Sequence, residues 1–303
     1  MVSISEIRRE IEGVKDLGSG LVAVFVDGTS GIGLSTAREF TRHATAPQIY
    51  LIGRNEAQAS EIMTEFRSIN ESAKVDFIKT DVSLLKNVDC ACSEILQKEE
   101  KVNLLFLSAG IMTMQGRTET SEGVDKKLSL HYYSRMRFIY NLLPALERAT
   151  SSHPTSTSST SSTSSTSNST TTTTSNSSSS SNSSLARVVS VFSPGNEGPL
   201  IPHDLSLKTH YSLSNAAAHA ATMTSLALVH LAHANPSISF IHSRPGGVNT
   251  NLTREFHPVI RGLTSRLLTL LAPLNSWTGV IPVRESGERH VYVSTSGRFR
   301  AIR

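Results

Sequence analysis

The sequence predicts an α/β fold in which a single parallel sheet is doubly wound, with helices on both of its faces. Three observations support this prediction. An apolar run of strand length, residues 22–26, leads through a glycine-rich turn into a stretch with the apolar spacing of a helix. Further strand-length runs then alternate with helical patterns, which is the order of β-α-β units. The chain has 303 residues, which suits one such domain.

The remaining elements follow this alternation in order. After the first strand we expect strands at 48–52, 75–78, 102–107, 187–191, 238–242 and 290–293. We expect helices at 34–40, 57–66, 88–96, 128–148, 214–233 and 263–271. Right-handed crossovers between such strands give a Rossmann-type domain that spans residues 1–303, with ligands at the carboxyl ends of its strands.

A low-complexity tract interrupts this domain at residues 151–184. Of its 34 residues, 29 are Ser or Thr. Such a segment buries almost no apolar surface and cannot offset the entropy lost on ordering. Because it falls between a predicted helix and a predicted strand, we expect a disordered insertion within the domain.

The turn after the first strand has the features of a dinucleotide site. Its candidate cofactor-binding residues are Gly28, Ser30, Gly31, Ile32 and Gly33. A helix that opens at such a turn directs its free N–H groups at a pyrophosphate.

One residue departs from the glycine pattern. Asp27 occupies the place of the first glycine, so a carboxylate lies near an anionic ligand. At an effective dielectric constant near 20, this repulsion costs on the order of 1–3 kcal/mol. We expect Gly28 to absorb the strained backbone angles of the turn.

The end of the second predicted strand bears on the choice of cofactor. NAD sites place a carboxylate about 20 residues after the glycines, where it binds the ribose 2′-hydroxyl. This chain has Arg54 there, and a guanidinium suits a 2′-phosphate. The sequence therefore favours NADP over NAD.

Composition excludes several other classes. The net charge of +4 comes without a Lys/Arg-rich run, so nucleic acid is not an expected partner. No apolar run reaches the roughly 18 residues of a membrane-spanning helix, and residues 1–15 lack the apolar core of a signal peptide. Cys90 and Cys92 have neither disulfide nor metal-site spacing. We expect a cytoplasmic protein without a membrane association or a metal.

Six short segments carry a more specific signal. They are GTSGIG at 28–33, DV at 81–82, SAG at 108–110, VVSVFS at 188–193, YSLSN at 211–215 and PGGVNT at 245–250. Together they resemble the short-chain dehydrogenase/reductase family, and more narrowly its fungal members in secondary-metabolite pathways. The resemblance spans roughly residues 21–293, apart from the Ser/Thr tract.

The resemblance implies roles at the adenine end of the cofactor. Asp81 and Val82 would flank the adenine, while Ala109 and Gly110 would let the backbone approach the cofactor closely.

It also implies roles at the nicotinamide end. The segment from Pro245 and Gly246 to Thr250 would border the nicotinamide, with Val248 and Thr250 nearest its carboxamide. Ser193 matches the family's catalytic serine, whose hydroxyl polarises the substrate carbonyl. Family members often pair through two of their helices, so the resemblance also implies a homo-oligomer as an option.

The family's catalytic dyad is incomplete in this chain. The family uses a tyrosine as general acid and base, with a lysine four residues later that lowers the pKa of the phenol. One alignment places Tyr211 at the tyrosine and Asn215, an uncharged amide, at the lysine. A second alignment places Ala217 and Ala221 at these positions.

A further departure concerns the asparagine that holds a water in the family's proton relay. The matching position is His131, which could itself relay a proton. Taken together, the pattern predicts an NADP-dependent oxidoreductase that acts on a carbonyl or alcohol of a small molecule, with Ser193, Tyr211, Asn215 and His131 as candidate catalytic residues. The alternatives are a catalytically silent nucleotide-binding protein and a non-redox isomerase or dehydratase.

Overall fold

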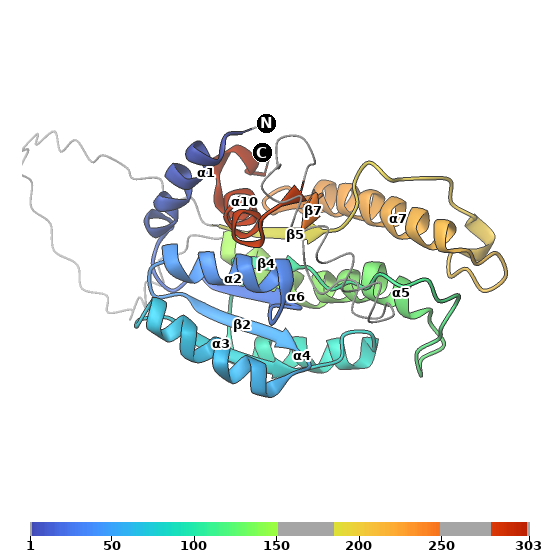
Figure 1. Cartoon of the computed structure of the whole chain (residues 1–303), viewed down its shortest axis with the longest axis horizontal. Helices are drawn as coiled ribbons and strands as arrows, with labels where there is room; N and C mark the ends of the chain where they lie inside the picture. The colour runs from blue at the N-terminus through green and yellow to red at the C-terminus, as the bar shows by residue number, and fades with distance from the viewer. Residues whose placement is uncertain (1, 151–184, 249–279, 302–303) are drawn as a thin grey trace, which may run out of the picture.

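A computed structural model describes residues 2–150, 185–248 and 280–301 of the chain (Figure 1). At its centre lies a six-stranded parallel sheet in the order β3-β2-β1-β4-β5-β6. The chain builds outward from β1 in one direction and then, from β4, in the other. The predicted fold class is confirmed, and the point where the strand order reverses lies between β1 and β4, where doubly wound sheets bind ligands.

The strands of this sheet are β1 (Val22–Val26), β2 (Gln48–Gly53), β3 (Lys74–Lys79), β4 (Leu104–Leu107), β5 (Arg187–Val191) and β6 (Ser239–Ser243). A separate pair is formed by β7 (Gly247–Val248) and β8 (Val280–Ile281). The helices are α1 (Ile4–Ile11), α2 (Gly31–His43), α3 (Glu56–Ile69), α4 (Leu85–Lys98), α5 (Lys126–Leu128), α6 (Ser134–Thr150), α7 (Leu213–Ala234) and α10 (Val283–Thr295).

Each face of the sheet is covered by its own set of helices. Successive residues of β1 point to opposite faces, so Val24 packs in a core with α4, α6 and α7, and Phe25 in a core with α1, α2, α3 and α10. Both side chains are fully buried. Burial on both faces explains why the central strands read as continuous apolar runs.

The predicted strand at 290–293 is wrong, because these residues lie in α10. The helix packs on α2 so closely that a Cβ at Gly287 would come within 2.4 Å of Ser35 Oγ. His290 Nδ1 is 2.6 Å from the Ser286 carbonyl one helical turn earlier. The β-branched and aromatic residues of this segment favour a strand locally, and packing against α2 overrides that preference.

One predicted helix is divided in the structure, and two predicted segments lie outside the described residues. The predicted helix at 128–148 is divided into α5, a π-helical turn (Ser129–Tyr133) and α6. The predicted insertion at 151–184 and the predicted helix at 263–271 lie outside the described residues.

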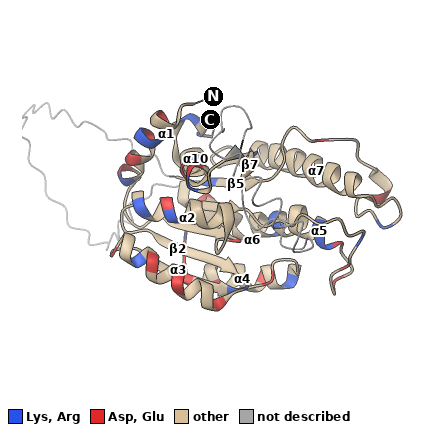
Figure 2. Cartoon of the chain, viewed as in Figure 1, with Lys and Arg blue, Asp and Glu red and all other residues tan. Residues whose placement is uncertain are grey.

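Charged side chains are unevenly distributed over the helices. Figure 2 shows acidic and basic residues intermixed on α1 to α4, whereas α7 carries neither. Leu226 and Val229 on α7 are more than half exposed. Among the described residues, no helix is both long and apolar enough to cross a membrane.

Candidate functional site

Two adjoining cavities lie at the carboxyl ends of the strands. The larger, of about 720 Å³, opens where β1, β4 and β5 end, and the smaller opens where β1, β2 and β3 end. Asp27 and Gly110 line both cavities. The two therefore form one elongated cleft across the point where the strand order reverses, with Asp27 at its middle.

The glycine-rich turn forms the floor of this middle section. Ser30, Gly31 and Ile32 line the larger cavity at the N-terminus of α2, as the sequence predicts. A Cβ at Gly33 would come within 2.5 Å of both the Asp27 carbonyl and Ser108 Oγ, so only glycine lets the helix approach the strand here. The N-terminus of α2 thus opens into a cavity whose size suits a diphosphate, whereas the smaller cavity has a volume of only about 20 Å³.

The strained backbone angle is not where we expected it. Asp27 itself has a φ of +63°, in the left-handed region that favours glycine. Gly28 instead packs inward, where a Cβ would meet Phe25 at 2.8 Å. Gly28 supports the turn without lining either cavity.

The smaller cavity gathers the residues expected at the adenine end: Arg54, Asp81, Val82, Ala109 and Gly110. Burial raises the pKa of the Asp81 carboxyl, but hydrogen bonds from Ser83 and the nearby cations Arg54 and Lys126 outweigh it and leave that pKa below its usual value. Lys126, which sequence reasoning missed, also lines this cavity. Two cations therefore lie beside the ribose end of the cleft.

A buried arginine supports the floor of the larger cavity. Arg135 on α6 is 1% exposed, and its guanidinium donates to Ser190 Oγ and to the Val191 carbonyl at 2.7 and 2.8 Å. It also donates to the Ala109 carbonyl at 2.5 Å, which ties the end of β5 to the loop after β4. Burial lowers the pKa of Arg135 to about 9, and the negative charge of Asp27 opposes this shift. Arg135 therefore stays positive at neutral pH, with Asp27 as a counter-charge.

His131 lies on the cavity wall but does not carry a charge there. Its Nε2 accepts a hydrogen bond from the Ile111 backbone N–H at 3.1 Å. Burial lowers its pKa to about 3, and the positive charge of Arg135 acts in the same direction. The ring is therefore neutral at physiological pH, and the nitrogen that could take up a proton is already an acceptor. This geometry does not favour the proton-relay role we considered.

The dyad segment brings alanines, not tyrosine, to the cavity. Ala217 lines the larger cavity, and Ala221 is fully buried one helical turn later. Tyr211 does not line the cavity, and its buried hydroxyl has no hydrogen-bond partner among the described residues. Ser212 caps the start of α7 by accepting from the Asn215 N–H at 3.0 Å, and the Asn215 side chain donates to the His210 carbonyl at 2.8 Å. The geometry thus matches the second alignment, and Tyr211 and Asn215 are not placed to act as a catalytic pair.

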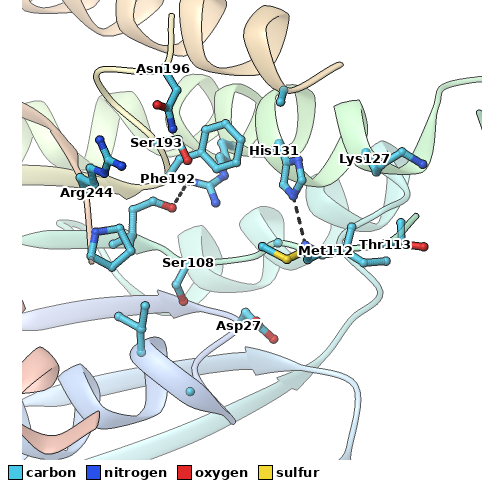
Figure 3. A pocket seen from close by; sticks show the side chains of 18 of the residues that line it. Asp27, Ser108, Met112, Thr113, Lys127, His131, Phe192, Ser193, Asn196 and Arg244 are labelled. Atoms are coloured by element: carbon cyan, nitrogen blue, oxygen red, sulfur yellow. Dashed lines mark hydrogen bonds between the residues drawn. The ribbon is translucent and has the colours of Figure 1, made fainter. Parts of the chain in front are cut away.

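Three polar side chains lie together at the far end of the larger cavity. Figure 3 shows Ser193, Asn196 and Arg244 grouped on one side, with Asp27 lower in the view. Ser193 was expected here, whereas Asn196 and Arg244 were missed. Arg244 could have been found from position alone, since it directly follows the carboxyl end of β6, and Asn196 lies in the loop that follows β5.

The segment after β6 is partly at the site. Pro245 and Gly246 line the larger cavity, as expected. Val248 lies in β7 and is not among the lining residues, and Thr250 is outside the described residues.

Comparisons with known proteins agree with this geometry. A family model described as short chain dehydrogenase matches residues 21–178. An oxidoreductase of Emericella nidulans is 39% identical over 99% of this chain and 79% of its own length. The oxidoreductase andH of Emericella variicolor is 37% identical over 99% of this chain and 77% of its own.

Solved structures share the fold. L-sorbose reductase from Gluconobacter frateurii, in complex with NADPH and L-sorbose, matches with a TM-score of 0.61 at 18% identity, over 93% of this chain and 92% of its own. The MalC Reductase/Diels-Alderase from Malbranchea aurantiaca matches with a TM-score of 0.59 at 15% identity, over 93% of this chain and 92% of its own.

Proposed function

This chain belongs to the short-chain dehydrogenase/reductase family, and from that premise we propose that it binds NADP(H) and reduces the carbonyl group of a small, largely apolar molecule in fungal secondary metabolism. The observation that carries the proposal is the elongated cleft. Asp27 and Gly110 line both of its cavities, the N-terminus of α2 opens into one, and two cations flank the other. The relatives are fungal oxidoreductases, which supports the proposed setting.

The preference for NADP is supported by the charges at the ribose end. Arg54 follows β2 on an exposed loop, and Lys126 lies at the start of α5 on the opposite wall of the same small cavity. A guanidinium and an ammonium together suit the extra phosphate of NADP. Asp81 stands at this end too, but its carboxylate oxygen already accepts two hydrogen bonds from Ser83.

The residues at the other end limit the chemistry. Bound NADPH would supply a hydride to the substrate carbon. Ser193 lines the cavity and is placed to donate a hydrogen bond to the substrate oxygen. The second alignment puts Ala217 and Ala221 at the family's tyrosine and lysine positions, where neither side chain can donate a proton. We therefore expect the oxygen to take its proton from water. Such a site suits a carbonyl that is already activated by conjugation.

Cofactor titration tests this proposal. We expect NADPH to bind more tightly than NADH, and Arg54→Ala to weaken NADPH binding by about tenfold while leaving NADH unchanged. Arg148→Ala is the matched control, since this exposed arginine lies at the end of α6 and donates to the Glu100 carbonyl. Equal binding of the two cofactors, unchanged by the Arg54 variant, would overturn the NADP assignment.

The alanines at positions 217 and 221 also favour a second function, that of a catalytically silent NADP-binding protein. Turnover separates the two. NADPH oxidation with a panel of conjugated carbonyl compounds supports the reductase, whereas tight binding without oxidation of any of them supports the silent protein.

A further inference from the structure

The far end of the larger cavity holds a guanidinium that has no partner among the described residues. Arg244 directly follows β6 and lines the cavity. It forms no hydrogen bond or ion pair within residues 2–150, 185–248 and 280–301, although arginines elsewhere in these ranges form many. A Cβ at Gly195 would lie 3.6 Å from its Nη1, which places the guanidinium against the loop that carries Ser193 and Asn196.

The nearby acid is already occupied. Glu197 Oε2 accepts from the Gly195 N–H at 2.7 Å, and its Oε1 accepts from Ser225 Oγ on α7 at 2.6 Å. Ser225 is also 2.8 Å from His242 Nδ1 on β6. Glu197 therefore fastens the loop to α7 and β6 and forms no ion pair with Arg244.

This network presents the loop's side chains in a fixed arrangement. The Gly198 N–H donates to Thr222 Oγ1 at 2.9 Å, which adds a second connection between the loop and α7. Ser193 and Asn196 thus face the cavity from a loop that is hydrogen-bonded to α7 and, through Ser225, to His242 on β6 (Figure 3). A hydroxyl, an amide and a guanidinium converge on one end of the cavity.

The rest of the cavity selects against a small polar ligand. Its walls away from the turn include the apolar residues Ile111, Met112, Phe192, Leu213, Ala216 and Ala217. Lys127 and Arg135 also line the cavity, but Lys127 Nζ donates to the Gly116 carbonyl and the Arg135 guanidinium donates to Ser190 and Val191. The carboxylate among the described lining residues, Asp27, belongs to the turn at the middle of the cleft. A complementary ligand has an apolar body and carries a negative charge at one end.

We propose that Arg244, with Asn196, forms a subsite for a planar two-oxygen anion beside Ser193, so that the substrate of the proposed reductase is an acidic molecule, either a carboxylate or an enolised 1,3-dicarbonyl. This inference rests on the proposed function, because it names the substrate class of the same cavity. A guanidinium donates two parallel hydrogen bonds to such an anion, and the Asn196 amide adds an uncharged donor, while Ser193 keeps its hydroxyl for the carbonyl to be reduced. The carbonyl to be reduced then lies next to this anion, against the alanine wall.

Ligand binding tests the subsite without any turnover. The probes are 2-naphthoate, its neutral analogue 2-naphthamide and dimedone, an acidic 1,3-diketone, titrated by calorimetry with and without NADP⁺. We expect 2-naphthoate to bind about tenfold more tightly than 2-naphthamide, and Arg244→Gln to remove this preference. Arg67→Gln, which changes an exposed arginine on α3, is the matched control. Tight binding of dimedone in place of 2-naphthoate would identify the enol form of the same anion.

A second variant covers the case in which Arg244→Gln unfolds the protein. Asn196 is exposed, and Asn196→Asp places a negative charge beside Arg244. We expect this variant to weaken the binding of 2-naphthoate and dimedone and to leave the binding of 2-naphthamide unchanged. Failure of the wild type to bind either anion, or a preference for 2-naphthoate that survives both variants, overturns the subsite. A wild type that binds the anions but no NADPH overturns the proposed function and leaves the subsite intact.

Discussion

Replacing Asp27 by glycine removes both the negative charge and the strained backbone angle that this residue brings to the cleft. Asp27 lines both cavities, so its carboxylate lies where a bound diphosphate would cross from one to the other. Its φ of +63° is strained for an aspartate, whereas glycine adopts this angle without strain. The same carboxylate is a counter-charge for Arg135, a buried residue that also lines the larger cavity.

These effects predict tighter cofactor binding and two opposing changes in the free energy of unfolding. Two unit charges about 6–12 Å apart at an effective dielectric constant near 20 repel by about 1.4–2.8 kcal/mol, so Asp27→Gly should tighten NADPH binding by about tenfold to a hundredfold. Relief of the backbone angle adds about 1 kcal/mol to the free energy of unfolding. Loss of the counter-charge makes the buried guanidinium of Arg135 more costly, which offsets part of that gain.

The control is Asp27→Asn, which keeps the size of the side chain and tolerates a positive φ but removes the charge. NADPH affinity is measured by fluorescence titration at low and high salt, and the free energy of unfolding by urea denaturation. We expect both variants to tighten binding, with the larger gain at low salt, where screening is weakest. An asparagine variant whose affinity stays within about twofold of the wild type at low salt would refute the electrostatic explanation.

Two further predictions concern the dyad segment and buried histidines. Because Ala217 and Ala221 occupy the dyad positions, Ala217→Tyr combined with Ala221→Lys should raise the rate of NADPH-dependent carbonyl reduction by about 100-fold, whereas Asn215→Lys should not; a gain from Asn215→Lys alone would contradict the alignment. Burial lowers the pKa of His131 to about 3 and that of His290 to about 4, so the unfolded chain binds more protons between about pH 4 and 6.5. The free energy of unfolding should therefore rise with pH in this window, by up to about 1.4 kcal/mol per pH unit for each histidine, and urea denaturation of His290→Gln should show a shallower slope.

The parts of the fold that follow from local pattern could be predicted. The run at 22–26, the glycine turn and the alternating apolar segments each give a signal within a few residues, and the six strands of the main sheet lie where these signals place them. The same is true of Arg54, whose role depends only on its position at the end of a strand.

The parts that depend on tertiary packing could not be predicted. The alanine-rich start of α7 has no local feature that fixes which residues face the cavity, so Tyr211 and Ala217 were equally plausible candidates. The neutrality of His131 follows from complete burial beside Arg135, which no sequence window contains. The strand predicted at 290–293 failed for the same reason, because contact with α2 decides its conformation.

The close crossing of α10 on α2 has a mechanical consequence. Ser35 Oγ donates to the Val283 carbonyl at 2.8 Å, and Gly287 leaves no room for a side chain between the two helices. The helix whose N-terminus opens into the larger cavity is thus held in place by a segment some 250 residues further along the chain. Contact with α10 holds the N-terminal end of α2 in place independently of the length of the connections between the two helices. We therefore expect length variation among homologous chains to concentrate in those connections.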